Sequence, residues 1–181
     1  MCSMNQDQVT IEYVLAGKTD HFATLMNKYH NEIFSFVFNM LGNYDDTEDL
    51  LQEIFLRVYE NLSKYDKEKS SFRTWLYRVA SNYTLNYLKS SRYKKRVKQE
   101  VNIELLQDDT DIYEEAIKDQ QIKLVIAAMK KLLSPKHQKI LILHYFSGFT
   151  VKEISEVLEM PDKTIYKALH SSIEKIKKEV T

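Results

Sequence analysis

Apolar residues at helical spacing are the feature that most limits how this chain can fold. Between Phe22 and Leu41 they recur at steps of three and four residues, which places them on one face of a helix. Further stripes lie in residues 50–62, 72–88, 122–133 and 165–176. Strands joined by tight turns would need more than the three Gly and two Pro of the chain. The sequence therefore predicts an all-α protein.

Residues of the expected types stand at the ends of these helices. Gly17 and Gly42 follow the first two apolar stretches, and glycine commonly ends a helix. The pair Ser134-Pro135 predicts an N-cap followed by proline at the first helical position, with one helix running over residues 136–146. Thr150 to Glu153 fits a capping box, which predicts another helix start.

The formal charge is zero, but it is the sum of blocks of opposite sign. The net charges are −7 for residues 1–66, +9 for residues 67–98, −7 for residues 99–119 and +5 for residues 120–181. Such asymmetry is more informative about partners than the total. Residues 97–119 are acidic and lack a sustained apolar repeat, so we expect a linker between two domains.

An acidic helix stands directly before a basic, aromatic one. Five carboxylates and no Lys or Arg occur between Asn43 and Phe55. Positions i, i+3, i+4 and i+7 of one helix face are Asp49, Gln52, Glu53 and Leu56. Periodicity leaves open whether this face is simply solvated, with carboxylates favouring the helix dipole, or binds a partner. The contrast with the following helix suggests one basic protein partner and one nucleic acid.

Two residues of the basic helix, residues 72–91, each allow two interpretations. Trp75 is either a core residue or a platform on which a base stacks. Asn82 lies in the helix interior, where Asn is a poor helix former. It either makes a capping or cross-helix hydrogen bond or contacts a base, and the pattern does not decide between these.

Two helices joined by a short turn end the chain. A helix from Thr150 is followed by a break at residues 159–162 and then by a longer basic helix, which is helix-turn-helix geometry. In that motif the second helix enters the major groove. The exposed candidates for contacts are Lys163, Tyr166, Lys167 and His170. An ordinary helical hairpin is the alternative, and the +5 charge of residues 120–181 favours DNA binding.

Several classes of function lack support in the residues. Cys2 is the only cysteine, so a disulfide within the chain and a cysteine-based zinc site are excluded. The five His show no ligand spacing, and Gly-rich phosphate loops are absent. We therefore predict no catalytic residues, metal, cofactor or small-molecule substrate. Apolar stretches fall short of the roughly 20 residues that span a bilayer, and no signal pattern precedes them, so we expect a cytoplasmic protein without membrane insertion.

Together these motifs resemble the extracytoplasmic-function (ECF) branch of the bacterial RNA polymerase sigma factors. The motifs that carry the resemblance are residues 16–22, the acidic residues 46–55, the aromatic and basic residues 72–82, and the helix-turn-helix from Thr150. The resemblance implies two small helical domains, a region 2-like domain over residues 1–96 and a region 4-like domain over residues 120–181, joined by the acidic linker 97–119.

The resemblance also implies a function. An alternative sigma factor binds core RNA polymerase and directs promoter-specific initiation; a free-standing helix-turn-helix regulator is the alternative hypothesis. The face formed by Asp49, Gln52, Glu53 and Leu56 would dock on the clamp helices of the largest catalytic subunit. An anti-sigma factor is a further expected partner.

The resemblance assigns promoter contacts to two sets of residues. The minus-ten element would be held by Tyr65, Arg73, Arg78 and Asn82. The minus-thirty-five element would be contacted by Lys136, Lys139, Lys163, Tyr166, Lys167 and His170. Ala168 and Ser171 stand where the family usually has arginines, which puts phosphate anchoring by this helix in doubt.

Overall fold

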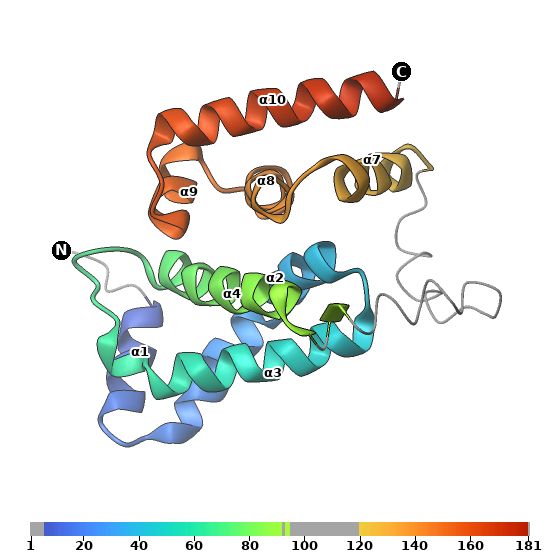
Figure 1. Ribbon diagram of the computed structural model, residues 1–181. Helices are drawn as coiled ribbons and strands as arrows, with labels where there is room; N and C mark the ends of the chain where they lie inside the picture. Colours follow the sequence, from blue (N-terminus) through green and yellow to red (C-terminus); the bar gives the residue numbers. More distant parts are fainter. Residues whose placement is uncertain (1–5, 92, 95–119, 181) are drawn as a thin grey trace.

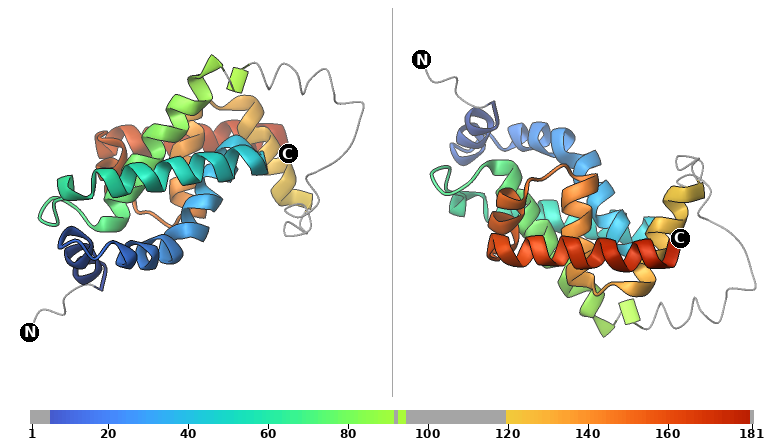
Figure 2. Two further views of the ribbon diagram at one scale, coloured as in Figure 1. Left: turned by 90° about the horizontal axis from the view of Figure 1, so that it is seen from below. Right: turned by 90° about the horizontal axis from the view of Figure 1, so that it is seen from above.

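The computed structural model describes residues 6–91, 93–94 and 120–180, and every regular element within them is helical. The helices form two groups, with the C-terminal group lying over one side of the N-terminal group (Figure 1). Views from below and above show the same stacking (Figure 2), in which α9 contacts α4 and the turn after α8 contacts α2. The predicted all-α fold is confirmed. The expected linker, residues 97–119, lies outside the described residues.

In the N-terminal group, the elements whose bounds the described residues give are α-helices and short 3-10 turns. The α-helices are α1 (Gln6–Leu15), α2 (Phe22–Leu41), α3 (Tyr44–Glu60) and α4 (Phe72–Lys89), and the 3-10 turns are η1 (Thr19–His21) and η2 (Leu62–Lys64). The C-terminal group consists of α7 (Gln120–Leu132), α8 (Pro135–Leu141), a π-helical turn η3 (Ile142–Phe146), α9 (Val151–Leu158) and α10 (Asp162–Val180).

The apolar stripe of α2 forms the centre of the N-terminal group. Ile33 and Val37 are fully buried, and so are Ile54 of α3 and Leu76 of α4. Burying such a side chain contributes about 1.5–3 kcal/mol relative to leaving it in water. The opposite side of α3 is exposed, whereas α4 contacts α9 of the C-terminal group on the side away from this core.

A buried carboxylate fixes α1 against α2. Asp7 is 5% exposed, and it accepts a hydrogen bond of 2.6 Å from the hydroxyl of Tyr29 and one from the ammonium of Lys28. These partners replace the water that the carboxylate loses on burial. Burial and the hydrogen bond to Asp7 raise the pKa of Tyr29 above its ordinary value.

Capping side chains begin the two helices that carry the candidate surfaces. Asn43 accepts a hydrogen bond of 3.0 Å from the backbone N–H of Asp46 at the start of α3. Ser71 does the same for Thr74 at the start of α4, at 3.1 Å. Gly42 ends α2 with φ +76°, a left-handed conformation that glycine adopts without strain.

The C-terminal group contains the predicted helix-turn-helix. Thr150 accepts from the backbone N–H of Glu153, and the Glu153 carboxylate accepts from the backbone N–H of Thr150, so both halves of the capping box form. Ser134 is the N-cap before Pro135, although its side chain makes no capping hydrogen bond. Lys131 of α7 forms an ion pair of 2.7 Å with Glu179 near the end of α10.

The helix predicted over residues 136–146 differs in its second half. It is α-helical only to Leu141, and the chain then widens into the π-helical turn η3. Here the backbone N–H of Ser147 bonds to the carbonyl of Ile142 at 3.0 Å. The ring of His144 lies 2.9 Å from the carbonyl of Phe149, so the wide turn is tied to the segment that leads into α9. Every helix among the described residues is too short or too polar to cross a lipid bilayer.

Candidate protein and nucleic-acid interfaces

Four residues of α3 form one exposed face, which we call the acidic surface: Asp49, Gln52, Glu53 and Leu56. Leu56 is 55% exposed and adds an apolar side chain to this face. Asp46, one turn earlier, is instead buried beside the N-cap. Asp46 therefore belongs to the helix start, whereas the carboxylates of the following two turns are exposed to solvent. The structure brings together all four residues predicted for this surface.

Tyr65 lies in an aromatic cluster at the start of α4. Its ring centroid is 5.6 Å from those of both Phe72 and Trp75, and its hydroxyl donates to the carbonyl of Ser70 at 3.1 Å. Burial raises the pKa of the Tyr65 phenol. Phe72 is buried and Trp75 is half-buried, so Trp75 belongs to the edge of the core. We call this cluster the aromatic wall; Tyr65 and Trp75 are its partly exposed members.

Arg73 of α4 contacts both groups of helices. Its Nε donates to Glu32 of α2 at 2.8 Å, and its terminal nitrogen donates to the carbonyl of Ser147 at 2.7 Å. The guanidinium carbon also lies 4.2 Å from the ring centroid of Phe149, in a cation–π contact. Arg73, which was predicted to hold a DNA strand, therefore bonds to the C-terminal group of helices.

Arg78 and Asn82, one turn apart on α4, differ in exposure. A terminal nitrogen of Arg78 donates to the carbonyl of Glu156 at 2.6 Å, and another lies 3.4 Å from the carboxylate of Glu159. Asn82 is exposed. The sequence alternative in which Asn82 makes a capping or cross-helix bond has no counterpart among the hydrogen bonds of the described residues. Its side chain is available to a ligand.

The predicted contact face of α10 is fully open. Lys163, Tyr166, Lys167 and His170 are exposed, with Tyr166 at 63%. On the other side of the same helix Ile165 and Leu169 are buried. The helix thus has one apolar side packed on α8 and α9 and one polar side that faces solvent.

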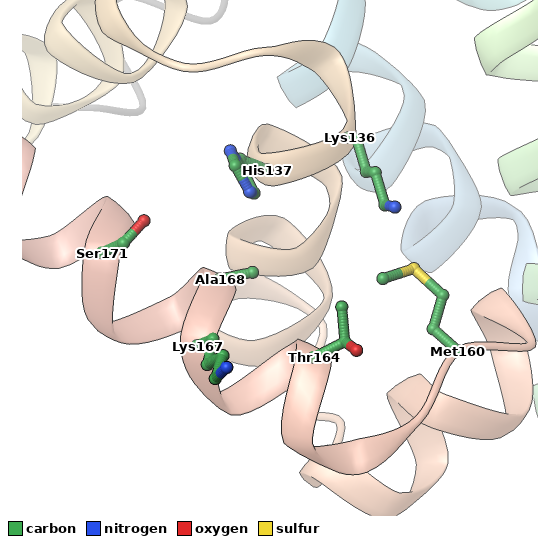
Figure 3. A pocket seen from close by; sticks show the side chains of 7 residues that line it. All are labelled: Lys136, His137, Met160, Thr164, Lys167, Ala168 and Ser171. Carbon is green, nitrogen blue, oxygen red and sulfur yellow. The ribbon is translucent and has the colours of Figure 1, made fainter.

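A groove of about 260 Å³ lies between the start of α8 and the first half of α10, and of the contact face only Lys167 lines it (Figure 3). It is lined by Lys136, His137, Met160, Thr164, Lys167, Ala168 and Ser171. Ala168 and Ser171 are the positions at which larger cations were expected. Their small side chains leave the groove open, and the positive charge comes from the lysines instead.

Lys139 lies in a different environment from Lys136. Lys136 is exposed, whereas Lys139 is only 5% exposed. Burial, together with the smaller effects of the charges of Lys136 and Lys89, lowers the pKa of Lys139 to about 8. Lys139 would have to move to reach a phosphate, so its assignment as a DNA contact stays a prediction that this arrangement does not favour.

Phe149 was missed by the sequence analysis. Its position directly before the Thr150 N-cap is where an apolar residue often packs against the fourth helical residue, here Ile154, and both are buried. That signal could have marked Phe149 as buried. It could not have shown that the ring would lie against Tyr77 of the other group, 4.7 Å between centroids.

No three His, Cys, Asp or Glu side chains in the described part of the chain are gathered so that they could hold a metal ion. The arrangement that is present consists of a carboxylate surface, an aromatic wall beside arginines, and a lysine-bearing groove. These are features of binding to proteins and nucleic acids through charge and stacking.

Comparison with known proteins agrees with this arrangement. Residues 25–93 match the family described as Sigma-70 region 2, and residues 123–176 match Sigma-70, region 4. The ECF RNA polymerase sigma factor SigW of Bacillus subtilis is 28% identical over 177 residues, covering 94% of each chain. The RNA polymerase sigma-H factor of Pseudomonas aeruginosa is 26% identical over 190 residues, covering 98% of this chain and 95% of its own.

Among solved structures, CnrH in complex with the cytosolic domain of CnrY has a TM-score of 0.68 at 15% identity, covering 96% of both chains, and so shares the fold. Both sigma-70 regions occur here in order, and relatives of the ECF type align along nearly the full length. The chain therefore belongs to the sigma-70 family, as an ECF RNA polymerase sigma factor.

Proposed function

We propose that this sigma factor divides its work among three surfaces, each assigned to one partner. As an ECF sigma factor it binds core RNA polymerase and directs promoter-specific initiation. We assign polymerase docking to the acidic surface of α3, the minus-ten element to α4 with Tyr65, and the minus-thirty-five element to α10 with the groove beside it. The observation that carries the proposal is the exposed carboxylate face directly preceding a basic, aromatic helix.

The acidic surface suits a basic helical partner. Its carboxylates steer and orient a cationic protein, and the 55% exposed Leu56 adds an apolar contact at the end of the same face. The clamp helices of the largest catalytic subunit are the partner that the family resemblance implies. Since α3 is rigidly packed on its other side, docking needs no rearrangement of the helix.

The minus-ten assignment is supported by the chemistry of α4. Single strands are generally held by stacking on aromatic rings and by neutralisation of phosphates. Tyr65 supplies an aromatic wall, Arg73 and Arg78 supply charge, and Asn82 offers an exposed amide that can bond to a base edge.

The minus-thirty-five assignment is supported by the open face of α10. Side chains near the start of a recognition helix reach base edges in the major groove, and nearby cations contact phosphates. Lys163, Tyr166, Lys167 and His170 are exposed on that face, and Lys136 lies across the groove from Lys167 (Figure 3).

We further propose the domain limits 1–96 and 120–181 with residues 97–119 as the linker, and an anti-sigma factor as a regulatory partner. One solved sigma factor of similar fold, RpoE of Bartonella quintana, was determined with the anti-sigma factor NepR (TM-score 0.63, 15% identity, 88% of this chain and 96% of that chain). The proposal assigns the chain no reaction of its own, because RNA synthesis belongs to the polymerase. It places the protein in the cytoplasm, where polymerase and promoter meet.

Transcription reconstituted from purified parts tests the proposal. Core polymerase with this chain should start RNA from promoters of its host that core alone cannot open. Double-stranded DNA binding by the chain alone, with no effect on core, would instead support a free-standing regulator. The negative control is the variant Asp49→Arg with Glu53→Arg. It should not open promoter DNA, because we expect it not to bind the polymerase.

A further inference from the structure

The helix α1 has no part in the three surfaces assigned above, yet it holds a buried carboxylate. Asp7 accepts a hydrogen bond of 2.6 Å from the hydroxyl of Tyr29 on α2. The ammonium of Lys28 donates to the other oxygen of the same carboxylate. Burial of a carboxylate costs free energy, which these charge-assisted bonds offset. Asp7 therefore holds the Tyr29 side chain in one orientation.

A line of packed rings leads from Tyr29 to Tyr65. The ring of Tyr29 is buried, and its centroid lies 5.6 Å from that of Phe72, the first residue of α4. The buried ring of Phe72 in turn meets Tyr65 at 84° between planes and 5.6 Å between centroids. Such rings cannot shift independently, because a protein interior is packed with little spare volume. We call this set the Asp7 row; its members are Asp7, Tyr29, Phe72 and Tyr65.

Two further observations place α1 beside the aromatic wall. The helix contacts η2, the turn that ends directly before Tyr65. Burial, and to a smaller extent the negative charge of Asp7, raise the pKa of the Tyr65 phenol. The carboxylate therefore lies close enough to Tyr65 for its charge to act on that ring. The two ends of the Asp7 row are near one another in space as well as joined through the rings.

We propose that Asp7 is a positioning residue for the minus-ten contact, which holds the Tyr65 ring through the Asp7 row so that a DNA base can stack on it. The inference rests on the proposed minus-ten role of Tyr65 and adds to it a residue that does not touch DNA. Stacking has a specific geometry, so it depends on where the ring is held. The helix α1 then contributes to promoter opening from outside the DNA interface.

Two variants of the full chain break the Asp7 row at its first bond. Asp7→Asn keeps the size of the side chain and removes its charge. Tyr29→Phe removes only the hydroxyl and leaves the ring in place against Phe72. Glu12→Gln and Tyr13→Phe make corresponding chemical changes at exposed positions of the same helix α1, and they are the matched controls.

Trp75, the only tryptophan of the chain, reports the packing of the aromatic wall, because its ring centroid lies 5.6 Å from that of Tyr65. In the chain alone, we expect both variants to show red-shifted emission and stronger quenching by acrylamide, since a loosened wall admits water to the half-buried indole. Circular dichroism and thermal melting must show that Asp7→Asn is folded, and the milder Tyr29→Phe keeps the test decisive if it is not. Parental emission from the folded variants would overturn the proposal.

Promoter opening with core polymerase is the functional measurement. Permanganate reactivity of unpaired thymines should fall about tenfold in both variants, which corresponds to about 1.4 kcal/mol and lies within the range for one base stacked on an aromatic ring. Co-migration with polymerase should not change, because α1 is not part of the acidic surface. The two controls should open the promoter as the parent does. Normal opening by the folded variants would overturn the proposal.

A double-mutant cycle with Tyr65→Ala shows whether Asp7 acts through the Tyr65 ring. If it does, Asp7→Asn lowers opening in the parent but causes no further loss in Tyr65→Ala. Equal losses in both backgrounds would overturn the positioning role of Asp7 and leave the proposed contact of Tyr65 standing. Normal opening by Tyr65→Ala itself would instead refute the minus-ten role of Tyr65 and the inference with it.

Discussion

The ring of Phe149 meets that of Tyr77 at 64° between planes and 4.7 Å between centroids, although the two residues belong to different sigma-70 regions. Phe36 of α2 lies on another side of Tyr77, 5.4 Å between centroids. The three rings therefore join the core of α2 and α4 to the base of the helix-turn-helix. Phe149 and Tyr77 are each 1% exposed, so their contact removes both rings from water.

Reversing the acidic surface should abolish polymerase binding without unfolding the chain. In Asp49→Arg with Glu53→Arg, two cations face the basic partner that the carboxylates attracted. Both residues are exposed, so the helical signal in circular dichroism should be retained. Co-migration with core polymerase on gel filtration measures the association.

The matched control for this variant is Glu12→Arg with Asp20→Arg, which makes the same change in net charge on exposed residues of α1 and η1. Polymerase should still bind the control. Equal binding of parent, variant and control would refute the assignment of the acidic surface and leave the docking face unidentified.

Removing the capping box should destabilise the C-terminal domain by about 1 kcal/mol. Thr150→Ala deletes the hydroxyl that accepts from the backbone N–H of Glu153 at the start of α9. Ser134→Ala alters an N-cap whose side chain makes no capping bond, so it should cost much less. Urea unfolding followed by circular dichroism compares the two. Equal losses of stability in the two variants would show that the hydrogen bond from Glu153 to the Thr150 hydroxyl does not stabilise the domain.

Asn82→Ala should impair promoter opening more than polymerase binding. The Asn82 amide is exposed on α4, so its loss leaves the helix core unchanged while removing a donor and an acceptor for a base. Permanganate reactivity of unpaired thymines measures opening, and gel filtration measures binding. Asn86→Ala, also exposed on α4, is the control and should open promoters normally. Similar opening by both variants would assign the minus-ten contact elsewhere.

Features of the fold that neighbouring residues decide could be predicted from the sequence. The end of α2 at Gly42 and the start of α9 at Thr150 depend on backbone conformation and bonds within one turn. The acidic surface followed from helical spacing alone, since four residues at i, i+3, i+4 and i+7 must share a face.

Contacts that join distant parts of the chain could not be predicted from the sequence. The π-helical turn depends on a bond from Ser147 to Ile142 and on how that loop meets α4, and residue types do not specify either. Arg73 and Arg78 donate hydrogen bonds to backbone carbonyls of the C-terminal group. Every residue has such a carbonyl, so side-chain types could not predict these contacts between the two groups of helices. Lys139 was assigned to a DNA contact by the family resemblance, and its burial at 5% exposure depends on packing that the resemblance does not specify.

Burial of Lys139 gives the stability a dependence on alkaline pH. In the folded state its pKa is lowered to about 8, chiefly by burial, against about 10.4 in an unfolded chain. Between these values the unfolded state binds more protons, so this group makes the protein more stable as pH rises through that window. Below about pH 8 the cost of the buried charge is present in full.

Lys139→Met keeps the length of the side chain and removes the charge. At neutral pH we expect the variant to be more stable than the parent, by on the order of 2 kcal/mol, because one unit of pKa shift corresponds to about 1.4 kcal/mol and part of the shift is screened. The advantage should shrink as pH rises from about 8 towards 10.4, where the parent lysine becomes neutral in both states. Urea unfolding at a series of pH values measures the difference, with Lys152→Met on the exposed side of α9 as a control that should stay within about 0.5 kcal/mol. A loss of stability at neutral pH, or a gain that does not vary with pH, would mean that the Lys139 ammonium is well solvated or paired in the folded protein.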